Sequence, residues 1–104
     1  MNKSAFGYFD NIEQETRENA NFRKVLYTGA YSQLVVMCLK PGEEIGLEEH
    51  DGHDQFIRIE AGHAEVILGE EKFDARDDDA FVIPSGIKHN VTNTSQTEDL
   101  KLYT

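Results

Sequence analysis

Two short stretches of the sequence contain side chains that can bind a metal ion or transfer a proton. Glu48 and His50 are two residues apart, so in an extended segment their side chains point to the same face. After a tight turn, Gln55 can return on the neighbouring strand to the same interior. The second stretch begins with the rigid turn at 84–86, which delivers His89 at the start of a strand. Each stretch thus has residue types and a spacing that can support chemistry.

The residues around these two stretches resemble the two sequence motifs of the cupin family. The first motif is Gly, five residues, His, one residue, His, three or four residues, Glu, six residues, Gly, and the segment from Gly42 to Gly62 keeps this spacing. The second is Gly, five residues, Pro, one residue, Gly, two residues, His, three residues, Asn, and the chain follows it from Asp78 to Asn93. Asp78 replaces the leading glycine, and Asp tolerates the left-handed conformation better than most residues, so we expect the turn to be kept. The resemblance covers residues 42–93 and implies an all-β fold, a cupin-type jelly-roll β-barrel or double-stranded β-helix.

The resemblance also implies a metal site formed by Glu48, His50, Gln55 and His89. Glu48 stands where the motif has His, and Gln55 where it has Glu. One carboxylate and two imidazoles still form a set suited to iron(II) and compatible with manganese, nickel or zinc. The amide oxygen of Gln55 is a weak donor, so Gln55 either coordinates loosely or hydrogen-bonds a bound water. The cofactor expected from the resemblance is therefore one divalent metal ion.

Simpler interpretations exist for each residue taken singly. Glu48 and His50 could form an ordinary surface pair. We expect His53 to be an exposed loop residue near the mouth of the site, and His63 to face solvent at the start of a strand. Cys38 is expected to pack inside a strand, because no base or metal partner stands beside it in the sequence. The acidic run at 70–79 lacks the spacing of an EF-hand calcium loop, which favours a solvated hairpin edge.

Short apolar or alternating runs, broken by Gly, Asn and Asp, must position these side chains. Such runs recur every eight to twelve residues and are typical of all-β domains. One polar segment, 11–20, could be a helix or an irregular surface segment, because it has no apolar stripe. We treat residues 1–104 as one domain, with an N-terminal arm at 1–21. The expected strands are 23–27, 33–40, 55–60, 63–68, 72–75, 80–83, 89–94 and 100–103.

The strand expected at 33–40 is apolar on both faces between Leu34 and Leu39. A half-exposed antiparallel strand should alternate, so a second apolar partner must cover its outer face. A symmetric homodimer would provide one. Burial beneath the N-terminal segment, with its Phe6, Tyr8 and Phe9 and also Ile12, is the alternative.

Composition excludes several classes of protein. The chain has 104 residues and a formal net charge of −10, so a nucleic-acid backbone would be repelled. Its longest apolar run has six residues, whereas a membrane helix needs roughly 20. The N-terminus lacks an apolar signal-peptide core, and the single cysteine cannot form an internal disulfide, so a cytoplasmic location is expected.

Three hypotheses about function remain open from the sequence. The first is a metal site with open positions for a small anionic or sugar-like ligand, possible for a metal-dependent isomerase or dioxygenase. The second is a non-catalytic module that binds a sugar or metabolite, with the metal structural or absent. The third is a structural dimeric domain with a vestigial site. No separate general base can be identified in the sequence, so it does not decide between catalysis and binding.

Overall fold

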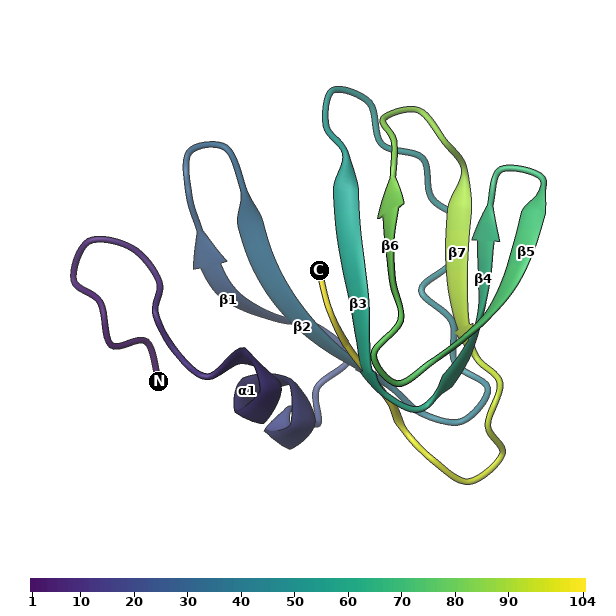
Figure 1. Ribbon diagram of the computed structural model, residues 1–104, viewed down its shortest axis with the longest axis horizontal. Helices are drawn as coiled ribbons and strands as arrows, with labels where there is room; N and C mark the ends of the chain where they lie inside the picture. The colour runs from purple at the N-terminus through teal and green to yellow at the C-terminus, as the bar shows by residue number, and fades with distance from the viewer.

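The computed structural model describes residues 1–104 as eight strands and one short helix (Figure 1). Each expected strand is present, with bounds that differ by one residue at most. The elements are α1 (Ile12–Glu18), β1 (Lys24–Thr28), β2 (Gln33–Leu39), β3 (Gln55–Ala61), β4 (His63–Leu68), β5 (Glu71–Arg76), β6 (Ala80–Ile83), β7 (His89–Asn93) and β8 (Leu100–Tyr103).

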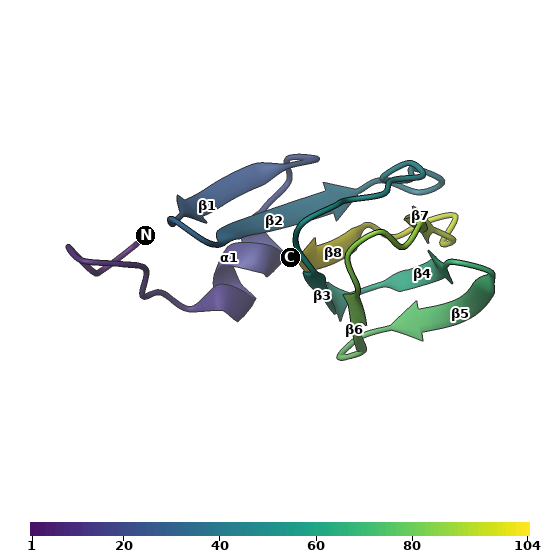
Figure 2. The ribbon, with the colours of Figure 1, turned by 90° about the horizontal axis from the view of Figure 1, so that it is seen from above.

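The strands form two antiparallel sheets that face each other (Figure 2). The larger sheet has the order β1-β2-β8-β3-β6, and the smaller one has the order β5-β4-β7. Residues 43–48 lie along the free edge of β7, where the Ile45 amide donates to the carbonyl oxygen of Val91 at 2.9 Å. The arrangement confirms the predicted jelly roll, although the sheets do not close into a complete barrel.

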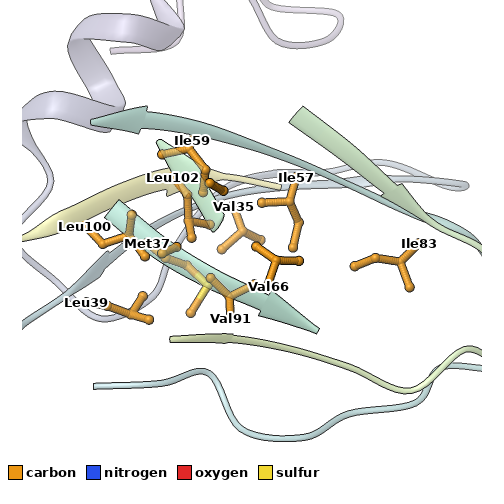
Figure 3. Close-up of a cluster of buried hydrophobic side chains, with 12 residues drawn as sticks. Val35, Met37, Leu39, Ile57, Ile59, Val66, Ile83, Val91, Leu100 and Leu102 are labelled. Carbon is orange, nitrogen blue, oxygen red and sulfur yellow. The ribbon is translucent and has the colours of Figure 1, made fainter. Parts of the chain in front are cut away.

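The hydrophobic core lies between the two sheets (Figure 3). Alternate residues of strands such as β2, β3 and β4 point into it, as the period of two along a strand requires. Ile57 and Ile59 of β3 are buried there, and Val66 of β4 faces them from the smaller sheet. This core fixes the faces of the strands, and therefore the side chains that reach the cavity beside it.

Both faces of β2 are buried within a single chain. Val35, Met37 and Leu39 belong to the core, whereas Val36 and Cys38 lie on the opposite face and are also inaccessible. Helix α1 contacts β2, β3 and β8, and the amide of Cys38 donates to the carbonyl oxygen of Asn21 at 3.0 Å. Burial raises the pKa of the Cys38 thiol, which supports its interpretation as a packing residue.

The N-terminal segment therefore supplies the cover that β2 requires, through helix α1 rather than through Phe6 and Phe9. Phe6 and Phe9 are exposed, whereas the ring of Tyr8 lies 6.2 Å from that of Tyr27 on β1. Since the chain covers its own apolar strand, this strand no longer requires a dimer. The homodimer stays a prediction.

Helix α1 forms despite its polar composition. The side chain of Asn11 caps it by accepting a hydrogen bond from the Gln14 amide at 3.0 Å. On its inner side Thr16 is fully buried, and its hydroxyl donates to the Ile12 carbonyl oxygen. Arg17 reaches from the last turn to Glu60, which is buried on β3. Capping and this ion pair hold the helix where an apolar stripe is missing.

Asp78 confirms the expectation for the altered second motif. Its φ of 73° is the only positive value outside glycine, so Asp78 adopts the left-handed conformation that the motif's glycine would take. The acidic run that precedes it forms the edge strand β5, which is exposed except at Ala75. A solvated hairpin edge is therefore the correct interpretation.

Helix α1, with seven residues, is too short to span a membrane, and no membrane-spanning helix is found.

Replacing Gly62 by alanine is expected to lower the free energy of unfolding by about 2 kcal/mol. Gly62 has a φ of 117°, and a Cβ atom there would lie 2.9 Å from the carbonyl oxygen of Asp99. Urea denaturation of Gly62→Ala and Gly7→Ala tests this, because a Cβ at Gly7 meets nothing within 4 Å. Equal midpoints for the two variants would contradict the steric argument.

Candidate metal centre

Glu48 and His89 are direct partners across an antiparallel bridge. The Glu48 amide donates to the carbonyl oxygen of His89 at 2.9 Å, and the His89 amide donates back to Glu48 at the same distance. Residues opposite each other in such a pair project their side chains to the same face. Two chain segments 41 positions apart are thereby brought together by the backbone itself.

His50 joins the same face because it lies two residues after Glu48 in an extended segment. The turn of the second motif holds this segment in place. The Gly86 amide donates to the carbonyl oxygen of His50 at 2.6 Å, and the Gly52 amide donates to the Ser85 hydroxyl at 2.9 Å. The Ser85 amide in turn donates to the Asp54 carboxylate at 3.0 Å. The turn at 84–86 therefore positions both His89 and the loop that carries His50.

The hydrogen bonding of His89 leaves one ring nitrogen free to act as a ligand. Its Nδ1 lies 2.9 Å from the carbonyl oxygen of Ile87, which can only accept, so Nδ1 carries the proton. Nε2 is then the atom with the lone pair. This atom is buried and has no hydrogen-bond partner. A neutral imidazole fixed through Nδ1 in this way is the usual state of a metal-binding histidine.

The ligand atoms of Glu48, His50 and His89 all lie within 4.8 Å of one another. Oε2 of Glu48 lies 3.0 Å from Nε2 of His50 and 3.9 Å from Nε2 of His89. His89 is buried, whereas the side chains of Glu48 and His50 remain 40% and 36% exposed. The group therefore opens on one side, where an additional ligand can approach.

Gln55 lines the same cavity as Glu48 and His50. Its Nε2 donates to the Thr104 hydroxyl at 2.9 Å, while its Oε1 is buried without a hydrogen-bond partner. The amide oxygen is thus available to a bound water or to a metal. The fourth predicted residue thus lines the same cavity as two of the candidate ligands, and its contribution to coordination stays a prediction.

The two remaining histidines lie in different surroundings. The ring of His53 is exposed and its centre lies 5.2 Å from that of His50, at the mouth of the cavity as expected. His63 is exposed at the start of β4 and pairs with Arg76. Neither belongs to the group of converging ligand atoms.

A cavity of about 820 Å³ extends from the candidate ligands to the inner face of the β1–β2 hairpin. Phe22, Arg23 and Gln33 line its far wall, and Tyr31 stands fully exposed at its rim. Sequence reasoning missed this wall. The sequence held one signal for it. Gln33 lies two residues before Val35, so in a strand both side chains point to the same face.

Comparisons with known proteins agree with this architecture. The family model described as "Cupin domain" matches residues 35–104. The protein BH2720 from Bacillus halodurans has a crystal structure that superposes with a TM-score of 0.91 at 40% sequence identity, over 98% of this chain and 81% of that one. The uncharacterized protein YrkC of Bacillus subtilis is 46% identical over 89% of this chain, and the uncharacterized protein L612 of Acanthamoeba polyphaga mimivirus is 42% identical over 93%. The chain spans 53% and 62% of the lengths of these last two proteins.

Proposed function

This chain belongs to the cupin family, and from that premise we propose that it binds one divalent metal ion and, on it, a small oxygen-donor ligand. Glu48, His50 and His89 would hold the metal, and Gln55 would coordinate it loosely or orient a bound water. Two imidazoles and one carboxylate are suited to iron(II) and compatible with manganese, nickel or zinc.

One observation carries the proposal. The buried Nε2 of His89 has no hydrogen-bond partner, although it points toward Glu48 and His50. An unpartnered buried polar atom is costly, and a metal ion would satisfy it. The proton on Nδ1 keeps this nitrogen in the form that can donate a lone pair.

The charge of the group favours an anionic or enolisable ligand. Glu48 is the single charged residue of the proposed ligand set, so a divalent ion leaves a formal charge of +1. A carboxylate, a hydroxy-ketone or a sugar acid offers the matching oxygen atoms. The open side of the group and the adjoining cavity provide room for such a molecule.

A bound metal would supply Lewis acidity for an isomerisation or, as iron(II), oxygen activation for a dioxygenase reaction. The protein would contribute orientation of the ligand against the cavity wall. The Glu48 carboxylate lies 3.0 Å from Nε2 of His50, and a metal ion held by both groups would take the place of the proton between these two atoms. The proposed reaction rests on the site alone, because YrkC and L612 are uncharacterized proteins.

Metal-depleted protein is expected to take up about one divalent ion per chain, because a single group of ligands converges. Isothermal titration calorimetry with iron(II), manganese, nickel and zinc measures the stoichiometry. Binding of none of the four ions would contradict the proposal.

A non-catalytic module for a sugar or metabolite is the second candidate. The neutral Gln55 and the wide, half-exposed site favour binding as much as turnover. Turnover that requires added metal would identify an enzyme. Saturable ligand binding without turnover would identify the module.

A further inference from the structure

Arg23 lies across the cavity from the candidate metal ligands. It is the only Lys or Arg among the residues that line this cavity. Its position two residues before Val25, which pairs with Val35, places Arg23 on the inner face of the β1–β2 hairpin. Val35 belongs to the core, so the same face of the hairpin continues from the core into the cavity.

Neutral groups hold the Arg23 guanidinium in place. Its Nη2 donates to Oε1 of Gln33 at 3.0 Å, and Nε2 of Gln33 donates to the Thr28 hydroxyl at 3.0 Å. Arg17 and Arg58 form ion pairs with carboxylates, whereas Arg23 and Arg76 form none, and of these two only Arg23 lines the cavity. One of five N–H donors is used, and the remaining fork is free for a planar anion.

The formal charges of the cavity indicate which anion fits. Glu48 and Asp54 are its acidic residues and Arg23 its base, so a divalent metal brings the total to +1. A ligand with one carboxylate and a second, neutral oxygen donor would neutralise this charge. A phosphate dianion would leave the cavity with a net negative charge, next to two carboxylates in an acidic protein. A planar carboxylate also matches the geometry of the guanidinium fork.

We propose that Arg23, positioned by Gln33 and Thr28, anchors the carboxylate of a keto or hydroxy acid whose neutral oxygen faces the metal site. This assignment rests on the proposed metal site and names the class of its ligand. The aromatic ring of Phe22 and the side chain of Met37 line the same cavity and would contact the carbon chain between the two oxygen groups.

The test measures ligand binding by calorimetry after metal loading, with pyruvate and levulinate as keto-acid probes of different length. We expect Arg23→Gln to raise the dissociation constant of the better probe by about tenfold or more, because charge-assisted hydrogen bonds are lost. The affinity for the metal itself should stay unchanged. Methyl levulinate, which lacks the anion, should bind wild type and Arg23→Gln equally.

Lys24→Gln is the matched control, because it removes the same charge from the adjacent position. Lys24 pairs with Val36 and therefore lies on the opposite face of the hairpin. Equal losses in the two variants, no loss in Arg23→Gln, or no binding of either keto acid would overturn the anchor. Tighter binding of glycerol 3-phosphate than of the keto acids would overturn the assignment to a carboxylate.

The same titrations separate this inference from the proposed function. If wild-type protein takes up no metal, the probes are titrated into the metal-free protein. Binding that still depends on Arg23 would then support the anchor while the metal proposal fails. Metal uptake together with keto-acid binding that does not depend on Arg23 would support the metal proposal, and the anchor would then fail.

Discussion

His89→Ala is expected to lower the affinity for a divalent metal by about 100-fold or more, because it removes a buried, pre-oriented nitrogen from a set of three strong ligands. The Ile87 carbonyl oxygen accepts a hydrogen bond from Nδ1 of His89 and so holds this imidazole in its ligand orientation before a metal binds. Alanine at position 89 offers no nitrogen to take its place. Calorimetric titration of the variant with the metal that wild type binds most tightly measures the loss.

Variants of the neighbouring residues should rank in a defined order. His50→Ala should also remove most of the affinity, whereas Glu48→Gln keeps the shape and should cost about tenfold or more. Gln55→Ala should cost much less. His63→Ala, outside the site, is the control, and His53→Ala should leave metal affinity nearly unchanged although its ring lies beside that of His50. Abolished binding in His53→Ala together with unaltered binding in Glu48→Gln would show that the loop histidines form the site instead.

Arg58→Met should lower the free energy of unfolding by about 3 kcal/mol, since it removes a close partner of a buried charge. Glu60 is 1% exposed, and its carboxylate lies 2.9 Å from a guanidinium nitrogen of Arg58 and 3.3 Å from one of Arg17. Arg17 is half exposed and makes the longer contact, so it cannot compensate fully. Urea denaturation at neutral pH measures the change.

Two further variants separate the buried pair from the surface charges around it. Arg58 also contacts Asp78 at 2.7 Å, but that carboxylate is 77% exposed, so Asp78→Asn should cost about 1 kcal/mol or less. Arg58→Met combined with Glu60→Leu should regain part of the stability, because no buried charge is then left without a partner. A loss in Arg58→Met no larger than in Asp78→Asn would show that Glu60 does not depend on Arg58.

The sequence sufficed to predict the strands, because each short apolar run ends at residues that favour turns. The pairing of segments outside the expected strands was harder to predict from the sequence. Residues 43–48 pair with β7, yet Glu43, Glu44 and Gly46 give this segment no alternating pattern. The cover of β2 by the N-terminal segment was one of two alternatives from the sequence, which could not decide between them because α1 presents Thr16 rather than an apolar stripe to the sheet. Contacts made by polar residues leave no periodicity from which to predict them.

The candidate site was predictable as far as its motifs reach. The resemblance to the cupin motifs implied that Glu48, His50 and His89 meet, and the cross-strand bridge explains why the 40 residues between Glu48 and His89 do not separate them. The opposite wall of the cavity belongs to no motif, so Arg23 and Gln33 became visible only in the structure. The ion pair of Glu60 escaped prediction for a related reason, because a glutamate in a strand sequence does not indicate burial.

The larger sheet extends past the smaller one at the β1–β2 hairpin, and this has a consequence for how such a protein can diversify. The candidate metal ligands are tied to the backbone bridge and the turn at 84–86, whereas Arg23 and Gln33 lie outside the cluster of core residues. Substitutions at Arg23 and Gln33 therefore disturb little packing, and most such exchanges cost little stability. Selection could change the molecule that the hairpin recognises while the candidate ligand triad is inherited unaltered, so homologues that share this triad need not bind the same molecule.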